Sequence, residues 1–229
     1  MVLKMRSKLP IAIKICGITK TDQAQTISSL DIHAIGVIGV SSSPRYVIGD
    51  QRRKLFSKIS RNSPEIRRVW VVADLSDEEL DQALQGDGIP SVIQLHGNES
   101  CQRCSELRRR HPNTEFWKAL RIRSQKDILI ANKYAKEVNH LLLDAWNPNM
   151  LGGTGSQLPL AWLEEVDFPI PWWIAGGISA EWVKEGMKCI SPFGIDASSK
   201  LETSPGVKDI NKIHSLIKAV KKSKEDYSV

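Results

Sequence analysis

The chain has 229 residues and a mass of 25.6 kDa, which is enough for one large hydrophobic core and short for two. Its 41% hydrophobic and 25% charged residues are typical of a folded soluble protein and argue against a disordered, collagen-like or disulfide-rich small protein. No apolar run approaches the roughly 20 residues of a membrane-spanning helix, and the segment before Pro10 lacks the apolar region of a secretory signal. We therefore expect a cytoplasmic protein that does not bind membranes.

The net charge of +6 and the pI near 9.1 raise the question of nucleic-acid binding. The basic residues are dispersed, and the denser clusters at 52–54, 108–110 and 221–224 fall on predicted helices or in the tail, without interleaved aromatic residues. We therefore expect no nucleic-acid partner. An anionic small molecule is a more economical partner for this charge.

The four cysteines are too few and too irregularly spaced for a disulfide framework. Cys101 and Cys104 form a C-x-x-C with His96 and His111 nearby, so a zinc site has to be weighed. The pair lies inside a helical pattern, and no second pair of ligands with matching spacing accompanies it, as a specific zinc-binding motif would require. Helix packing is the favoured interpretation, and we expect no metal.

In chain order, eight short runs rich in β-branched residues alternate with polar helical patterns, which predicts βα units and a parallel sheet. The predicted strands are 11–16, 34–40, 69–73, 91–95, 115–120, 140–144, 172–175 and 193–196. The predicted helices are 21–30, 50–61, 77–85, 99–110, 124–136, 159–166, 179–187 and 208–222, several opened by capping residues: Thr21, Ser76, Asn98, Ser124 and Ser179.

These units repeat about every 26 residues, so eight of them occupy nearly the whole chain. Eight parallel strands close a TIM (β/α)8 barrel. We predict an α/β protein with a single barrel domain over 1–229, including a short N-terminal extension at 1–10 and a flexible tail at 221–229. A doubly wound open sheet is less favoured, because Gly17-Ile18-Thr19 follows the first strand in place of a glycine-rich dinucleotide fingerprint.

Active sites of such barrels lie at the C-terminal ends of the strands. Glycine-rich or hydroxyl-bearing pieces follow the last three predicted strands: Gly152, Gly153 and Gly155, then Gly176 and Gly177, then Ser198 and Ser199. Backbone N–H groups and hydroxyls in such loops can bind an oxyanion. A single glycine pair is more often only a turn, but three pieces on consecutive strand ends favour a phosphate site.

Cys16 ends the first predicted strand and Asp144 ends the sixth, so they would face each other across the barrel mouth. A thiolate can take a proton and a neutral carboxylic acid can donate one, which favours acid–base isomerisation. The alternatives are a buried apolar cysteine and an aspartate that caps a turn. Arg45, in the loop after the second strand, could clamp a carboxylate through its guanidinium or be an exposed cation.

In this order, the strand-end motifs resemble those of the phosphoribosylanthranilate isomerase family of tryptophan biosynthesis. They are KICGIT at 14–19, SPRY at 43–46, QLHG at 94–97, LLD at 142–144, GGTG at 152–155, AGGI at 175–178, DASS at 196–199 and PGVKD at 205–209. The resemblance covers about residues 11–220, and KICGIT together with QLHG is specific to this family among phosphate-binding barrels.

The resemblance implies an Amadori rearrangement of N-(5-phosphoribosyl)anthranilate without metal or organic cofactor. It implies Asp144 as the general acid, Cys16 as the general base and Arg45 as the group that holds the anthranilate carboxylate. It also implies that the glycine and serine loops bind the phosphate. We expect Gln94, His96 and Asp196 to contact the substrate as well.

The chain departs from the family pattern at three places. Gly39 stands where an aromatic residue is usual, Leu160 ends a segment that usually reads FDW, and Lys200 replaces a glycine. The wall near the anthranilate ring could therefore be looser or filled from elsewhere. None of these changes removes the predicted acid, base or anion clamp.

Three alternatives stay open. A histidine-pathway aminoaldose isomerase has similar chemistry but would present an aspartate where Cys16 stands. A barrel that binds phosphate ligands without catalysis is the second, and nucleic-acid binding is the third. Among partners, a transient contact with indole-glycerol-phosphate synthase is also predicted from the family, because some relatives are fused to that enzyme.

Overall fold

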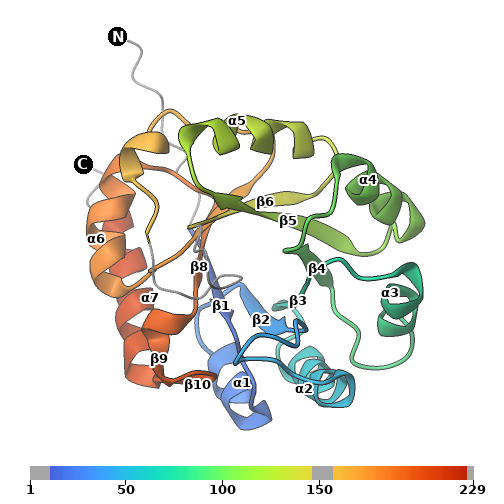
Figure 1. Ribbon diagram of the computed structural model, residues 1–229. Helices are drawn as coiled ribbons and strands as arrows, with labels where there is room; N and C mark the ends of the chain where they lie inside the picture. The colour runs from blue at the N-terminus through green and yellow to red at the C-terminus, as the bar shows by residue number, and fades with distance from the viewer. Residues whose placement is uncertain (1–10, 146–156, 226–229) are drawn as a thin grey trace.

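The computed structural model describes residues 11–145 and 157–225. Each strand pairs in parallel with the next, and β8 pairs with β1, so the sheet closes into a barrel ringed by helices (Figure 1). The barrel strands are β1 (Ala12–Cys16), β2 (Ala34–Ile38), β3 (Arg67–Val72), β4 (Val92–Leu95), β5 (Glu115–Ile122), β6 (His140–Ala145), β7 (Trp172–Ala175) and β8 (Gly194–Ala197). The predicted TIM barrel is confirmed.

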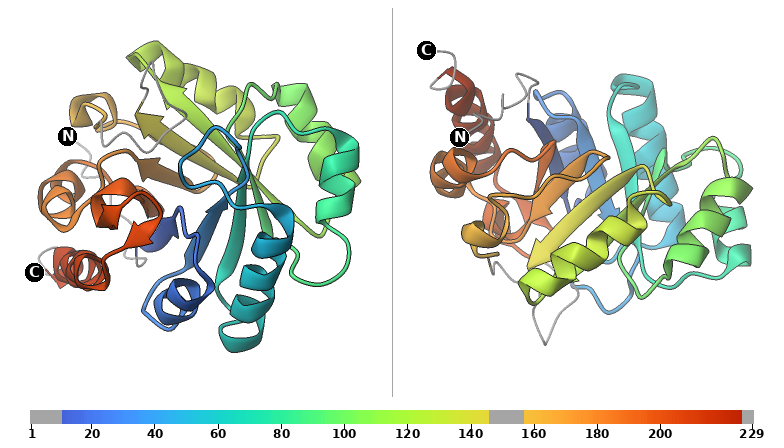
Figure 2. Two further views of the ribbon diagram at one scale, coloured as in Figure 1. Left: turned by 60° about the horizontal axis from the view of Figure 1, so that its bottom comes forward. Right: turned by 90° about the horizontal axis from the view of Figure 1, so that it is seen from above.

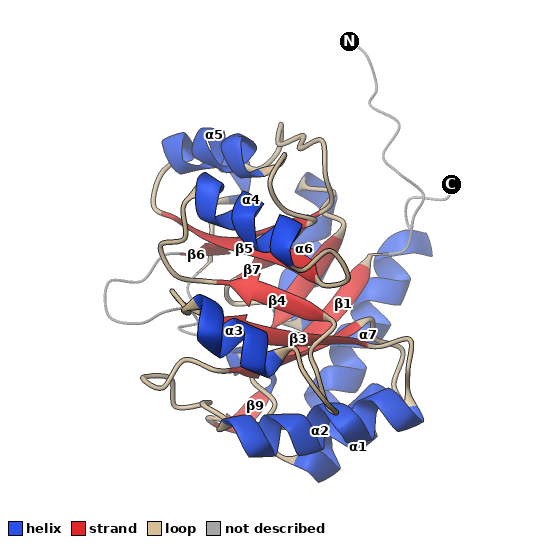
Figure 3. Ribbon diagram, turned by 90° about the vertical axis from the view of Figure 1, so that its right-hand side faces the viewer, coloured by secondary structure: helices blue, strands red, loops and turns tan. Residues whose placement is uncertain are grey.

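The helices cover the outside of the barrel, as the further views in Figures 2 and 3 show. They are α1 (Thr21–Ser28), α2 (Gly49–Asn62), α3 (Asp77–Ala83), α4 (Cys101–Arg110), α5 (Gln125–Tyr134), α6 (Ala180–Cys189) and α7 (Ile210–Glu225). Within the described residues, none of these helices combines the length and apolar character needed to cross a membrane.

The predicted helix at 159–166 is wrong. Only a short 3-10 helix, η1 (Leu160–Trp162), forms there. Glu164 and Glu165 would place two negative charges at the C-terminal end of a longer helix, where the helix dipole disfavours them.

Serine side chains cap several helices, although two predicted caps were misplaced. Thr21 is the first residue of α1, whose N-cap Lys20 makes no side-chain capping hydrogen bond, and Asn98 does not cap α4. Ser76 and Ser179 accept hydrogen bonds from the backbone of α3 and α6. At α4 the cap is Ser100, whose Oγ accepts from Arg103 N at 3.1 Å. The backbone N–H of Asn98 instead donates to Asp74 Oδ1 at 2.7 Å.

Alternation along the strands sorts the core into two layers. The outward-facing residues pack against the helices, while a smaller cluster fills the inside of the barrel. At the N-terminal end of the barrel, Trp117 stacks on both Trp173 and His140 with ring centroids 4.8 Å apart, and Phe193 packs edge-on against His140. These rings fill and close that end of the barrel.

A small hairpin between β8 and α7 was not predicted. It consists of the antiparallel strands β9 (Glu202–Ser204) and β10 (Val207–Lys208), and the 3-10 helix η2 (Ser199–Leu201) leads into it. Its turn uses Gly206 at φ +80°, a backbone conformation that favours glycine. The hairpin is joined to the segment around α1 by hydrogen bonds from Thr19 Oγ1 to Gly206 O and from Gln23 Nε2 to Lys208 O.

The two predicted terminal segments lie largely beyond this description. The extension at 1–10 is outside the described residues. Part of the predicted tail at 221–229 belongs to α7, which ends at Glu225.

Candidate active site

Cys16 lies at the C-terminal end of β1 with its side chain inside the barrel. It is 6% exposed and shares the inward face of β1 with Lys14, which is fully buried. Lys14 Nζ donates to Asp196 Oδ2 on the neighbouring strand β8 at 2.8 Å. A Cβ added at Gly36 on β2 would lie 2.6 Å from Cys16 Sγ and 3.0 Å from Lys14 Nζ, so this glycine makes room for both side chains.

The charges around Cys16 oppose one another. Burial raises the pKa of the Cys16 thiol and the Asp196 carboxylate adds to this effect, whereas Lys14 and Lys208 act to lower it. Burial by itself would lower the pKa of Lys14, but Asp196 and Cys16 outweigh it and raise the pKa overall. Lys14 is therefore a cation placed where a thiolate would need one.

Asp144 ends β6, and its alternation with Leu142 turns it into the barrel. It is 4% exposed. His96, just beyond β4, places Nε2 3.4 Å from Asp144 Oδ2. On the other side of the ring, Gln94 Nε2 lies 3.4 Å from His96 Nδ1. Three of the predicted site residues, from β4 and β6, thus form one contiguous polar group at the mouth.

Arg45 is buried, and its guanidinium is already engaged by Glu202, a residue that the sequence analysis missed. Arg45 Nε donates to Glu202 Oε1 at 2.8 Å, and Nη2 donates to Oε2 at 2.7 Å. Lys208 Nζ donates to the same Oε1 at 2.6 Å. The interpretation of Arg45 as an exposed cation is therefore wrong. Glu202 and Lys208 lie in the segment that resembles the family, but nothing in their spacing indicates a partner 157 residues away.

The predicted phosphate-binding pieces that the structure describes lie at adjacent strand ends. Gly176 and Gly177 follow β7 with φ of +94° and +64°, and Ser198 and Ser199 follow β8. The Ser198 hydroxyl donates to Cys16 O at 3.0 Å, so it joins the ends of β8 and β1. Gly152, Gly153 and Gly155 lie outside the described residues.

The space beside Gly39 is filled from elsewhere, by Trp70 of β3. A Cβ at Gly39 would lie 2.2 Å from Trp70 Nε1. Trp70 belongs to the outer core layer, and the Arg52 guanidinium of α2 stacks 4.1 Å from the centre of its ring. This departure therefore changes the packing between the sheet and α2.

The C-x-x-C pair shows the packing expected of helix residues. Cys104 is fully buried in the outer core, and burial raises the pKa of its thiol to about 12, while Cys101 is half-buried. Over the described parts of the chain, no group of three or more His, Cys, Asp or Glu side chains is arranged to hold a metal ion.

Comparisons with known proteins agree with this arrangement of motifs. The family described as N-(5'phosphoribosyl)anthranilate (PRA) isomerase matches residues 13–219. An N-(5'-phosphoribosyl)anthranilate isomerase of Nostoc punctiforme is 42% identical over 204 residues, covering 89% of this chain and 95% of that protein. One from Rippkaea orientalis is 40% identical over 205 residues, covering 90% of this chain and 94% of that protein.

Solved structures give the same result. The phosphoribosyl anthranilate isomerase of Thermotoga maritima superposes with a TM-score of 0.79 at 27% identity, covering 93% of this chain and 99% of that one. A phosphoribosyl anthranilate isomerase in complex with reduced 1-(o-carboxyphenylamino)-1-deoxyribulose 5-phosphate superposes with a TM-score of 0.72 at 26% identity, with the same coverage.

Proposed function

We propose that this chain, which belongs to the N-(5'-phosphoribosyl)anthranilate isomerase family, uses Asp144 and Cys16 to isomerise N-(5-phosphoribosyl)anthranilate in tryptophan biosynthesis. The product is 1-(2-carboxyphenylamino)-1-deoxyribulose 5-phosphate. One observation carries the assignment of the two residues: both side chains are buried, and both point into the mouth of one barrel from the ends of β6 and β1. A substrate lying between them would meet an acid and a base.

The first step in this proposal is ring opening. Asp144 donates its proton to the ribose ring oxygen, the bond between that oxygen and C1 breaks, and the lone pair of the anthranilate nitrogen forms a C=N bond. The result is a protonated Schiff base and an Asp144 carboxylate. His96, 3.4 Å from Asp144, stands where it can stabilise that carboxylate by donating from Nε2.

The second step is proton abstraction. The Cys16 thiolate takes the proton from C2, the electrons of that C–H bond form a C1=C2 double bond, and the C=N pair returns to nitrogen. The resulting enolamine tautomerises to the ketone. Lys14 is the buried cation beside the thiolate, and the electron sink in this step is the substrate's own iminium nitrogen.

The ends of the substrate are anionic, and the mouth offers a group for each of them. Arg45 suits the anthranilate carboxylate, because a guanidinium fork matches a planar carboxylate. Gly176 and Gly177 suit the phosphate, since backbone N–H groups at positive φ approach an oxyanion closely, and the hydroxyl of Ser199 can add a donor. The transient contact with indole-glycerol-phosphate synthase stays a prediction.

Turnover of freshly made phosphoribosylanthranilate tests the activity directly, through the change in anthranilate-type fluorescence. We expect Cys16→Ser and Asp144→Asn each to lower kcat by about 10²- to 10⁴-fold, the usual contribution of a positioned acid or base. Cys189→Ser, at a half-buried thiol on α6, is the matched control and should keep its rate. Near-normal turnover in either site variant would refute the role assigned to that residue.

A further inference from the structure

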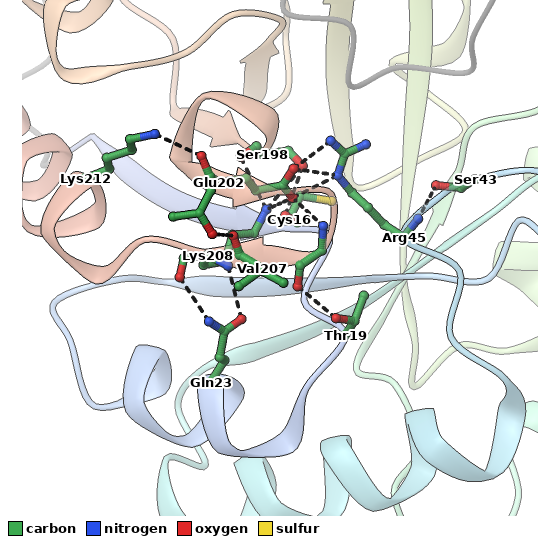
Figure 4. A network of polar contacts seen from close by, with 12 residues as sticks. Cys16, Thr19, Gln23, Ser43, Arg45, Ser198, Glu202, Val207, Lys208 and Lys212 are labelled. Carbon is green, nitrogen blue, oxygen red and sulfur yellow. Dashed lines mark hydrogen bonds and ion pairs between the residues drawn. The ribbon is translucent and has the colours of Figure 1, made fainter.

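Three charged side chains are buried together beside Cys16, and the mechanism above uses only one of them. Arg45 comes from the loop after β2, Glu202 from β9 and Lys208 from β10 (Figure 4). Their side chains are 6%, 4% and 0% exposed. Burying three charges costs free energy, so the cluster needs an explanation beyond packing.

Glu202 holds the guanidinium of Arg45 by one edge. The carboxylate receives Nε and Nη2 at 2.8 and 2.7 Å, which is the bidentate arrangement of a strong charge-assisted pair. Because Nε and Nη2 form one edge of a planar group, the neighbouring edge, which carries Nη1, is turned away from Glu202 (Figure 4). That second fork is the one a ligand could use.

The stem of Arg45 is fixed as well. A Cβ added at Gly17 would lie 2.6 Å from Arg45 Cδ, and Gly17 has φ +77°, so the arginine crosses the end of β1 directly over the residue that follows Cys16. The hairpin that carries Glu202 is itself tied down, because Gly206 N donates to Glu202 Oε1 at 3.3 Å and Lys212 Nζ donates to Glu202 O at 2.9 Å.

The cluster of Arg45, Glu202 and Lys208 carries a net charge that attracts an anion. Burial pushes the pKa of Glu202 upward, but the hydrogen bonds from Arg45 and Lys208 outweigh it and hold that pKa below its usual range. With two cations and one carboxylate, the cluster keeps one net positive charge. Without Lys208, the negative charge of Glu202 would cancel the positive charge of Arg45, and the pair would present no net charge to a ligand.

We propose that Glu202 is a positioning residue that sets specificity: it orients the free fork of Arg45 toward an aromatic carboxylate of the substrate, and Lys208 offsets the charge of Glu202. This inference rests on the proposed function, since it concerns how the anthranilate end of that substrate is bound. The hairpin of β9 and β10, which carries Glu202 and Lys208, thereby contributes to substrate selection.

A pair of inhibitors measures this role separately from turnover. The probes are the reduced product analogue with its 2-carboxyphenyl group and the same compound with a plain phenyl group, each assayed as a competitive inhibitor. The wild type should prefer the carboxylate. Glu202→Gln should reduce that preference by about tenfold or more, since a small misplacement of a binding group can cost up to about 100-fold, while the inhibition constant of the phenyl compound should change little.

Two further variants distinguish positioning from a general loss of stability. Glu202→Asp keeps the charge but withdraws the carboxylate by one methylene, so it should give a preference between those of the wild type and Glu202→Gln. Glu99→Gln removes another buried carboxylate, paired with Lys118 at 2.7 Å in the outer layer. It should lower the melting temperature and leave the preference unchanged.

The outcomes separate the two proposals. If the wild type does not turn over phosphoribosylanthranilate, the proposed function fails. If it does, but folded Glu202→Gln keeps the full preference for the carboxylate, the positioning role alone is refuted. Should Glu202→Gln not fold, an unchanged preference in Glu202→Asp refutes it equally.

Discussion

At the end of β1, Cys16 is subject to opposing electrostatic effects. Burial and Asp196 raise the pKa of its thiol, whereas Lys14 and Lys208 act to lower it. In the proposed mechanism Cys16 is the base, and a thiol with a raised pKa is mostly protonated at neutral pH but is a strong base once it is ionised. The rate should therefore increase with pH as the thiolate forms, and Lys14 should keep that rise from moving to still higher pH.

Lys14→Met tests this balance. Removal of the cation should raise the pKa of Cys16 further, so the ascending limb of the profile of kcat/KM against pH should move to higher pH and the rate at neutral pH should fall. Lys54→Met, at an exposed position on α2, is the control and should leave the limb in place. A limb at the same pH in Lys14→Met and in the wild type would contradict the role of Lys14.

At the scale of elements, β2, β3 and α2 are fitted to one another through Gly39. The indole of Trp70 occupies the space that a side chain there would need, and the guanidinium of Arg52 on α2 stacks over the same ring. Burial lowers the pKa of Arg52 to about 10, and the nearby Arg53 adds to this effect. Because this pKa is still well above neutral pH, Arg52 remains a cation over the indole.

Gly39→Ala should reduce the free energy of unfolding by about 1–3 kcal/mol, because overpacking a filled site displaces its neighbours. Trp70→Leu in the same chain should relieve the clash, so the double variant should lose less than the two single losses combined. Gly49→Ala is the control, since an added Cβ there meets nothing within 4 Å. Urea unfolding of the four variants measures the coupling, and strictly additive losses would contradict the packing argument.

For the whole molecule, the aromatic plug at the N-terminal end of the barrel includes one titratable ring. Trp173 Nε1 donates to His140 Nδ1 at 2.8 Å, so the ring is held in a neutral form. Burial lowers the pKa of His140 to about 4, with a smaller opposing contribution from Glu115. The unfolded chain takes up this proton near the ordinary histidine pKa of about 6.5, and the folded chain does so only at much lower pH.

Stability should consequently fall as the pH is lowered from about 6.5 to about 4, because the unfolded state binds more protons over that window. The contribution of His140 to this loss should reach roughly 3 kcal/mol. His140→Gln retains an acceptor for Trp173 and does not titrate, so its free energy of unfolding should depend less on pH. His214→Gln, on the exposed side of α7, should keep the wild-type dependence. Equal pH dependence in His140→Gln and in the wild type would contradict this account.

The parts of the fold that could be predicted are those governed by local pattern. All eight barrel strands follow from short, largely apolar runs, because a strand buried on both faces of a parallel sheet exposes little of its length to water. The two failures, at 159–166 and in the hairpin of β9 and β10, concern segments of two or three residues per element. Such segments are held by contacts with distant residues, as Thr19 holds Gly206.

The same division applies to the site. By itself the sequence determined the barrel, the ends of the strands as the place to look, and Cys16, Asp144 and Arg45 as residues at that place, because spacing and residue type are local properties. Only the tertiary structure decided that Lys14 pairs with Asp196, that His96 faces Asp144 and that Glu202 holds Arg45. These contacts join residues as far as 182 positions apart. Closure of the barrel brings them together, and electrostatic interaction depends on distance in space and on burial, neither of which the order of residues contains.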